Sequence, residues 1–308
     1  MPVIGSVAQM NEFSALLELR LSRVFQDDLP THPKLYPAWL TEKTVTRYVD
    51  RDRMATGFGP MPEKPPGNPI VVDKPYLGAE KSYTMKPYAL GFVAEYELIR
   101  WDKFGVFADI TRKLSRSGTD RKNVVTYAIL NNAFSTADSI YTTWNGEALC
   151  ETTHQLLRGG TAKNAPTVAV GLSYLGMQEA ITDYMLLPNE DGLYIVLSPK
   201  TVICHPSKAW VAKTLLKSTK RPGTADNDTN TLEGEFDYHT APFLTDTDAW
   251  FLAADKRRLS ESMRLELGDD LMFRQDYQIS TWNRVYSMYA SFRVAVSYWM
   301  GLWGSQGA

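Results

Sequence analysis

Two residues in the stretch CETTH can bind a metal ion. Cys150 and His154 lie four residues apart and can face one another as half of a zinc site. A structural zinc ion needs four such ligands, and the chain has no second Cys/His pair at matching spacing. The alternative is a turn with a buried cysteine, and the ligand count favours this second interpretation.

A second candidate metal site lies in TDTDAW, where Asp246 and Asp248 form a D-x-D pair. Such a pair can hold a divalent ion beside a sugar nucleotide, because carboxylates are the hard ligands that this ion prefers. Two aspartates in a turn before a strand are also common formers of Asx turns. The further oxygen ligands that the ion requires cannot be placed in the sequence. A metal-dependent transferase that uses Asp246 and Asp248 is therefore kept as the alternative function.

Other catalytic patterns are absent or isolated. The sequence has no G-x-x-x-x-G-K-[ST] phosphate loop, no G-x-G-x-x-G, no G-x-S-x-G and no H-E-x-x-H. The triplet GDD at 268–270 resembles a polymerase hairpin, but it is also ordinary hairpin-turn chemistry, which we favour. His32, His205 and His239 have no evident triad partner. We therefore predict no catalytic residue, no cofactor and no metal ligand.

Composition limits the class of protein. The chain of 308 residues is 44% hydrophobic, which is enough for one large domain or two ordinary ones with a real core. A formal charge of −2 gives no global basic field that would attract nucleic acid or an anionic membrane. The sequence contains neither a membrane-spanning apolar run nor a secretory signal at MPVIGSVAQMNEF. Cys150 and Cys204 are too few for a disulfide framework, and we expect them to be buried.

A Pro/Gly-rich stretch, TGFGPMPEKPPGNPIVVDKP, occupies residues 56–75. It can form neither a helix interior nor a central strand, because each proline fixes φ and removes a backbone donor. The flanking residues 44–51 and 77–99 are rich in β-branched and aromatic side chains and predict strands. Together they predict a long two-stranded excursion. An isolated hairpin is marginally stable in water, so this excursion should need a neighbour to lie on.

The N-terminal region combines a helix with an extended arm. Apolar residues within 11–27 recur near helical spacing and predict a short amphipathic helix that ends before Pro30. The following LPTHPKLYPAWL runs through prolines as an arm that carries Tyr36 and Trp39. A monomer would expose these aromatic side chains, as it would Trp299 and Trp303 near the C-terminus, and aromatic residues are enriched at protein interfaces. The alternative is that they fold back onto their own core.

The longest helical pattern begins at Asp102 and continues to about residue 134. Ser117 and Gly118 interrupt it, so that a kink or a break into two helices is possible. Ser173 resembles the N-cap of the next helix, which stops before Pro188.

Strands and one more helix follow. The apolar run LYIVLS predicts a strand buried on both faces, and residues 207–217 predict a helix. From Phe236 onward strands dominate, and VYSMYASFRVAVSYWMGLW alternates well enough to be a long strand with one buried face. The order of helix, strand and helix predicts a compact α/β subdomain.

This order of elements resembles the major capsid protein of tailed bacteriophages, which has the Hong Kong 97-like fold. The resemblance covers most of the chain. It is strongest in TGFGPMPEKPPGNPI leading into KSYTMKPYALGF, in AILNNAFS followed by WNGEALCETTH, and in PFLTDTDAWFLAADK. These stretches look like the family's extended loop, the end of its spine helix with the next turn, and the approach to its late strands. They indicate fold and role and identify no chemistry.

The resemblance implies an α+β fold with an N-terminal arm, an extended β-hairpin loop, a long spine helix, and peripheral and axial domains. The expected boundaries are 1–50 for the arm, 51–97 for the loop, 98–165 with 255–293 for the peripheral domain, and 166–254 with 294–308 for the axial domain. The proline-rich loop would be stiffened in advance to lie across an adjacent subunit, which lowers the entropy lost on docking. Its flanking strands would be able to pair with a neighbour's exposed edge.

The resemblance also implies self-assembly through pentamers and hexamers into an icosahedral shell around double-stranded DNA, without sequence-specific binding. The protein would be found in the virion capsid after assembly in the host cytoplasm, with no membrane contact. Portal and scaffolding or decoration proteins would be further partners. The predicted inter-subunit contact residues are Tyr36, Trp39, Phe58, Met61, Lys64, Ile70, Tyr76 and Lys81.

Two features of some relatives are not expected in this chain. Only about 50 residues precede the loop, so we predict no proteolytic removal of an N-terminal scaffolding segment. Some relatives join a loop lysine to an asparagine of a neighbour through an isopeptide bond. Lys64, Lys74 and Lys81 are candidates by location alone, and we predict no crosslinking because no partner can be placed.

Overall fold

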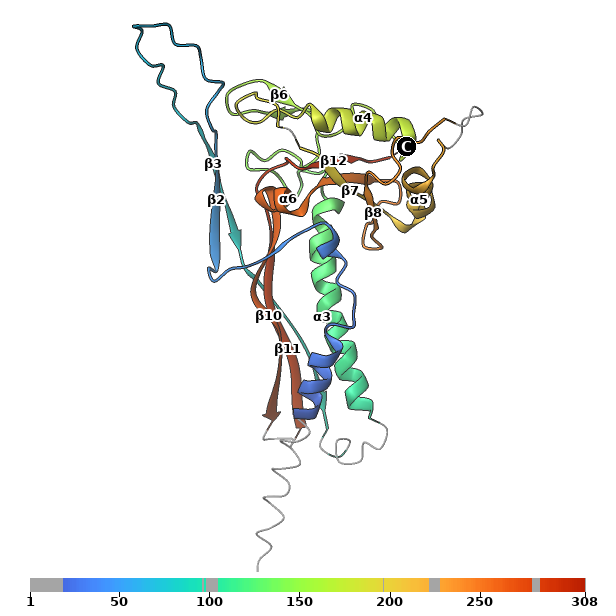
Figure 1. Ribbon diagram of the computed structural model, residues 1–308. Coiled ribbons are helices and arrows are strands. Elements are labelled where there is room, and N and C mark those ends of the chain that lie inside the picture. Colours follow the sequence, from blue (N-terminus) through green and yellow to red (C-terminus); the bar gives the residue numbers. More distant parts are fainter. Residues whose placement is uncertain are drawn as a thin grey trace, which may run out of the picture.

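The computed structural model describes residues 19–95, 97, 105–195, 197–221, 228–278 and 283–307. It shows a mixed α and β protein with a body, a long limb and a projecting hairpin (Figure 1). Among the described residues, no helix is both long and apolar enough to cross a membrane.

The limb is built on the sheet β1-β10-β11-β4. Its two longest strands, β10 (Met263–Gln278) and β11 (Asn283–Val296), are antiparallel, and β4 (Lys86–Ala94) pairs with β11. The short β1 (Glu42–Thr44) lies parallel to β10. We predicted residues 86–94 as part of the extended loop, and the structure places them in this sheet.

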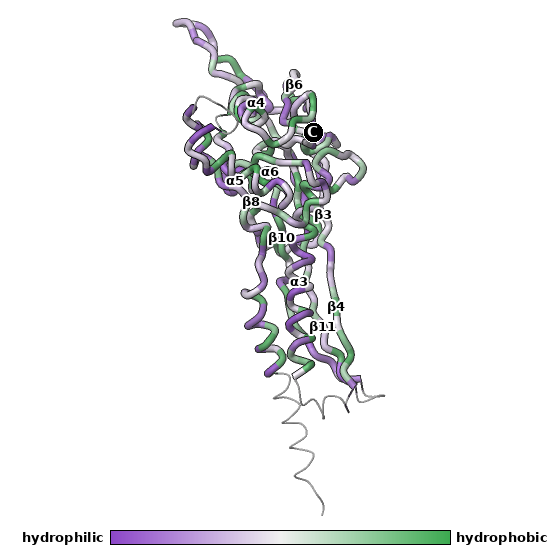
Figure 2. Tube along the Cα trace, turned by 90° about the vertical axis from the view of Figure 1, so that its right-hand side faces the viewer, coloured by the Kyte–Doolittle hydropathy of each residue, from purple (hydrophilic) through white to green (hydrophobic). Residues whose placement is uncertain are grey.

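Helix α3 (Val106–Asn131) runs along the limb and packs against β11 as one continuous helix (Figure 1). In Figure 2 its hydropathy changes from turn to turn, as the apolar spacing predicted. The glycine that interrupts the pattern, Gly118, produces no break in the helix. A Cβ atom there would lie 2.6 Å from side-chain atoms of both Leu271 and Met288, so glycine allows the helix to approach the strands closely.

The triplet at 268–270 does not form the hairpin turn that we favoured. It lies inside β10, where the register with β11 shifts between Leu267 and Asp269 and again between Asp269 and Met272. Such shifts are β-bulges, in which one strand carries extra residues. Asp270 pairs with the buried Lys122 of α3 at 2.5 Å. Asp270 therefore helps to join the bulge to the helix.

The body contains the sheet β12-β9-β7-β8. Strand β7 (Pro199–Cys204) is parallel to β8 (Asp237–Thr240) and antiparallel to β9 (Trp250–Ala254), which pairs with β12 (Leu302–Ser305). The remaining short elements are η1 (Tyr36–Ala38), β5 (His154–Gln155), β6 (Thr161–Ala162), η2 (Pro206–Lys208) and α6 (Lys256–Ser262).

Both helices predicted for the body are present. Helix α4 (Tyr174–Met185) begins after Ser173, whose Oγ accepts a hydrogen bond from the backbone N–H of Gly176 at 3.1 Å, as expected for an N-cap. Helix α5 (Ala209–Lys217) follows η2 and confirms the prediction for 207–217.

The prediction for LYIVLS was wrong. Leu193 and Tyr194 are exposed, and Tyr194 forms only an isolated bridge with Pro188. The central strand is β7, six residues later. Its sequence PKTVIC begins with a proline, which is tolerated at the first position of a strand. The predicted long C-terminal strand is divided into β11 and β12.

The four aromatic residues that a monomer was expected to expose are buried within their own chain. Tyr36 is 0% and Trp39 is 1% exposed, and both lie in the main hydrophobic core with Tyr127 of α3. Trp299 and Trp303 are buried in the same core. The arm therefore packs on its own subunit. A helix over residues 19–28 also packs on its own chain, with Phe25 against Leu114 of α3. Residues 11–18, the first part of the predicted N-terminal helix, lie outside the described residues.

Candidate functional site

The projecting hairpin is formed by β2 (Val49–Ala55) and β3 (Leu77–Thr84), which pair in antiparallel register. Residues 56–76 join them without a helix or strand and extend past the body (Figure 1). The two-stranded excursion predicted from the sequence is thus confirmed. In β2 half-buried and exposed residues alternate, so that one face of the strand lies toward the rest of the chain.

Buried charges attach the base of this hairpin to the limb. Asp52 of β2 accepts a hydrogen bond from Arg264 at 2.8 Å, and Arg264 pairs with Glu266 at 2.7 Å. Glu266 also pairs with Arg293 at 2.6 Å, and its side chain is fully buried. Burial opposes the charge of Arg264, but the carboxylates of Asp52 and Glu266 outweigh it and raise the guanidinium pKa.

Arg293 extends the attachment to the backbone of the hairpin. Its guanidinium donates hydrogen bonds to the carbonyl oxygens of Tyr48, at 2.9 Å, and Tyr83, at 2.6 Å. These carbonyls lie at the two ends of the hairpin that enter the limb. The network of Asp52, Arg264, Glu266 and Arg293, called here the base network, therefore fixes the direction in which the hairpin leaves the limb.

Lys81 also helps to attach the hairpin to the limb and does not lie on an exposed contact surface. It lies opposite Asp52 in the hairpin, and its Nζ donates to the carbonyl oxygens of Thr142 and Val296, at 2.5 and 2.8 Å. Burial lowers the pKa of its ammonium group to about 8. Its predicted role as an inter-subunit contact does not fit this position, since the amine is turned into its own chain.

A second attachment, called here the neck, lies where the two strands end. Arg158 pairs with Asp73 and with Asp191 of the body, each at 2.7 Å, and its guanidinium lies 5.2 Å from the centre of the Tyr76 ring. The backbone N–H of Gly57 donates to Asp191 at 3.0 Å. The hydrogen bond from Arg158 lowers the pKa of Asp73. No local pattern in the sequence marks the neck residues, because only folding brings them together.

Beyond the neck, residues 58–72 form a tip that carries large exposed apolar side chains. Phe58 is 64%, Met61 is 94% and Ile70 is 78% exposed. Val71 and Val72 extend this apolar surface, and Lys64 is exposed beside it. Of the eight predicted contact residues, the structure gathers Phe58, Met61, Lys64 and Ile70 here, with Tyr76 at the neck. Exposed apolar side chains gathered in one segment make the tip a candidate interaction surface.

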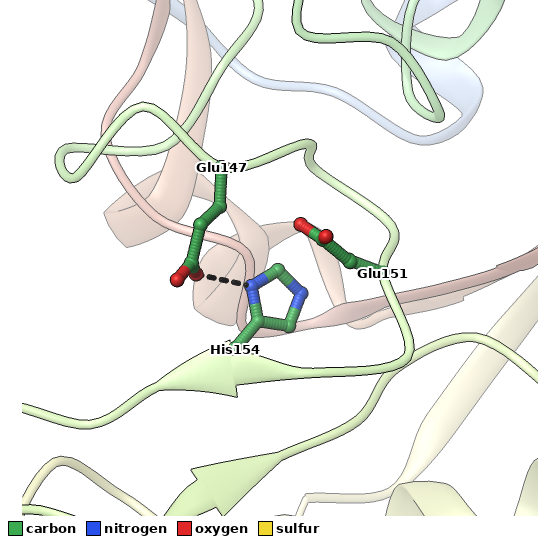
Figure 3. Close-up of side chains that lie close together, drawn as sticks. All are labelled: Glu147, Glu151 and His154. Atoms are coloured by element: carbon green, nitrogen blue, oxygen red, sulfur yellow. Dashed lines mark hydrogen bonds and ion pairs between the residues drawn. The ribbon is translucent and has the colours of Figure 1, made fainter.

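The cluster around CETTH contains three possible metal ligands: Glu147, Glu151 and His154, whose ligand atoms lie within 4.8 Å of one another (Figure 3). The carbonyls of Leu149 and Leu302 accept hydrogen bonds from the side-chain amide of Asn164. Its Oδ1 must therefore accept from Nε2 of His154, at 2.8 Å.

The other ring nitrogen of His154, Nδ1, lies 3.1 Å from Glu147, and the ring stacks on Trp299 at 4.5 Å. Both ring nitrogens are thus used in hydrogen bonds that tie the loop to the C-terminal segment. Cys150 is buried, as predicted, and burial raises the pKa of its thiol, which disfavours the thiolate that zinc binds. The arrangement supports a packing role.

The D-x-D pair is also used within the fold. Asp246 Oδ1 accepts hydrogen bonds from the backbone N–H groups of Asp248 and Ala249, at 2.9 and 3.3 Å, which is an Asx turn. Asp248 pairs with Lys208 at 2.7 Å, and this contact lowers the pKa of its carboxyl group. The two carboxylates shape the turn before β9, which supports the turn interpretation over the transferase.

Comparisons with known proteins identify the fold and a family. A family model described as phage capsid protein matches residues 78–303, which is most of the chain. No curated protein sequence matches it. The capsid of cyanophage P-SCSP1u is similar in structure, with a TM-score of 0.59, 8% identity, and coverage of 90% of this chain and 89% of that one.

Two further solved structures are similar. The capsid of a native GTA particle has a TM-score of 0.57 and 11% identity, and the match covers 89% of this chain and 90% of that one. A virus-like particle from Pyrococcus furiosus has a TM-score of 0.53 and 9% identity, with coverage of 93% and 97%. At such identities the likeness shows the fold alone.

Proposed function

The chain belongs to the phage capsid protein family, and on this premise we propose that it assembles through pentamers and hexamers into an icosahedral shell that encloses double-stranded phage DNA. In this proposal the chain is a structural protein without enzymatic activity. Its main partner is a copy of itself, and portal and scaffolding or decoration proteins join the same particle. Assembly takes place in the host cytoplasm, and the DNA is enclosed without sequence-specific contacts.

The observation that carries this proposal is the hairpin with its exposed tip. The base network and the neck attach the hairpin at two separate places, while Phe58, Met61 and Ile70 remain in water beyond them. Exposed apolar surface is unfavourable by roughly 25 cal/mol per Å² relative to burial. A copy of the chain that covers the tip removes this penalty. Because the hairpin is already held in one direction, little conformational entropy is lost on docking.

We assign the fold to the Hong Kong 97-like class as part of the same proposal. Helix α3 is the spine helix, and the sheet of β10, β11 and β4 with α3 forms the peripheral domain. The body around α4, α5 and β7 is the axial domain. Residues up to about 50 form the arm. Since β4 pairs with β11, the extended loop of this proposal is confined to residues 49–84.

Deletion of the tip tests the proposal. Residues 58–72 are replaced by a short Gly-Ser link, which retains Gly57 and Asp73 and hence the neck. We expect the variant to fold, with an unchanged circular dichroism spectrum, and to form no closed particles by electron microscopy and sedimentation. Lys113→Ala, which changes an exposed lysine on α3 outside the tip, is the control and should assemble. Normal particles from the deletion variant would refute the role given to the hairpin.

A further inference from the structure

One face of α5 exposes an aromatic and basic surface. Trp210 is 75% and Val211 is 40% exposed, whereas Ala212, Leu215 and Leu216 bury the opposite face of the helix. Burial of an aromatic side chain is a strong contributor to binding, so Trp210 beside Val211 on one ordered helix is a candidate contact surface.

The charge on this face is positive. Lys213 Nζ lies 5.4 Å from the centre of the Trp210 ring, in a cation–π contact, and Lys217 is exposed one turn further along. Within the described parts of the chain, neither lysine forms an ion pair with a carboxylate. We call Trp210, Lys213 and Lys217 the α5 face.

A groove with apolar and acidic side chains in its lining lies between α4 and residues 231–236. Its volume is about 660 Å³, which is within the usual range of ligand-sized pockets. Apolar side chains line part of it, among them Ile181, Met185 and Phe236. Glu179 and Glu235 are exposed at its sides.

Asp183 also lines this groove, but it is engaged with Lys163 at 2.8 Å. Glu179 and Glu235 form no ion pair with other described residues. The groove therefore combines apolar surface with uncompensated negative charge, which complements the aromatic and positive α5 face.

We propose that the α5 face of one copy docks into the α4 groove of the next copy. The inference rests on the proposed function and names the surfaces that join neighbouring subunits of a capsomer. Trp210 fills the apolar part of the groove, and Lys213 and Lys217 pair with Glu179 and Glu235. The two surfaces are different parts of the chain, so the contact is head to tail and repeats from copy to copy into a ring.

Cysteine crosslinking tests this pairing directly. Both native cysteines, Cys150 and Cys204, are buried, so introduced thiols are the reactive ones. The double variant Thr214→Cys with Gln178→Cys keeps the docking residues and places thiols beside Trp210 and in the groove lining. Under oxidation it should give a ladder of multimers on a non-reducing denaturing gel, whereas Thr214→Cys alone should remain monomeric. A dimer from this single variant, or no ladder from the double variant, would overturn the proposal.

Charge reversal provides a second test that does not depend on oxidation. Lys213→Glu with Lys217→Glu, and separately Glu179→Lys with Glu235→Lys, should each reduce particle yield by about tenfold or more. The fourfold variant restores opposite charges across the contact and should recover assembly. Lys113→Glu, an exposed lysine on α3, is the control and should assemble normally.

The outcomes separate this inference from the proposed function. If the unaltered chain forms particles and the reversed variants do as well, the α5 contact is wrong and the capsid role stands. Failure of the fourfold variant to recover, while it folds with an unchanged melting temperature, also overturns the inference. If the unaltered chain never assembles under any condition, both proposals fail together.

Discussion

The base and the tip of the hairpin are built in opposite ways. At the base, buried carboxylates and guanidinium groups satisfy one another within a single chain. At the tip, apolar side chains such as Met61 and Ile70 are left in water. Buried charges of this kind are costly to remove singly, and they fix a geometry more than they add stability. The difference indicates that the hairpin is oriented by its own chain, whereas its tip is exposed for the contact proposed above.

The largest expected effect is the loss of Glu266. The substitution Glu266→Ala leaves Arg264 and Arg293 buried without their shared carboxylate and should lower the free energy of unfolding by about 3–5 kcal/mol. Urea denaturation of the unassembled chain measures this change. Glu266→Gln retains the shape and should recover part of the loss. A decrease below about 1 kcal/mol for the alanine variant would mean that the base does not depend on this network.

Lys81 should make the free energy of unfolding depend on pH. Its pKa is about 8 in the folded chain, whereas a lysine in an unfolded chain titrates near 10.4. Between these values the unfolded chain binds more protons, so this residue makes the folded state more stable as pH rises from about 8 to 10. The gain is about 2 kcal/mol.

The variant Lys81→Met removes this titration and provides the comparison. The difference in unfolding free energy between the unaltered chain and Lys81→Met should grow in favour of the unaltered chain over that pH window. A difference that stays constant with pH would show that the amine is not held in a desolvated site.

The neck should have a smaller effect than the base, because Arg158 and Asp73 are partly exposed and the buried Asp191 keeps its hydrogen bond from the backbone N–H of Gly57. The substitution Arg158→Ala should lower the free energy of unfolding by about 1 kcal/mol. It should also increase amide hydrogen exchange in β2 and β3. Arg158→Lys keeps the charge but loses the two-sided pairing, and we expect an intermediate result. Unchanged exchange in the alanine variant would show that the base alone holds the hairpin.

The smallest effect on stability is expected at the tip. Met61→Ser and Ile70→Ser change only exposed side chains, so the free energy of unfolding should stay within about 0.5 kcal/mol. The same pair should prevent particle formation, as measured by sedimentation. A clear loss of stability in the unassembled chain would instead indicate that the tip packs on its own subunit.

The sequence predicted the elements with strong local signals. The spacing of apolar residues identified α3 and α5, the N-cap Ser173 identified α4, and the proline-rich stretch identified the hairpin. It failed where distant contacts decide the outcome. Tyr36 and Trp39 lie in an extended segment, but they are buried because α3 and the body close around them. No local pattern contains that information.

The same limit applies to LYIVLS and to the candidate site. PKTVIC resembles a loop because of its proline and lysine, yet Pro199 begins β7 and Lys200 reaches Asp255 at 3.3 Å. The exposed tip residues were predicted from the proline-rich stretch and its resemblance to the extended loop of phage capsid proteins. The contacts that attach the hairpin, such as Asp52 with Arg264 and Asp73 with Arg158, instead join residues more than 80 positions apart. Spacing along the chain gives no signal for such pairs.

Gly118 has a mechanical consequence for the limb. A shift of α3 by one turn would bring Leu114 or Lys122 to the point where Leu271 and Met288 now approach the glycine, and neither larger side chain fits there. The helix is therefore locked against sliding along the two long strands. Because the helix and the strands cannot slip past one another, we expect α3, β10 and β11 to move as one rigid unit when a force acts on the far end of the limb.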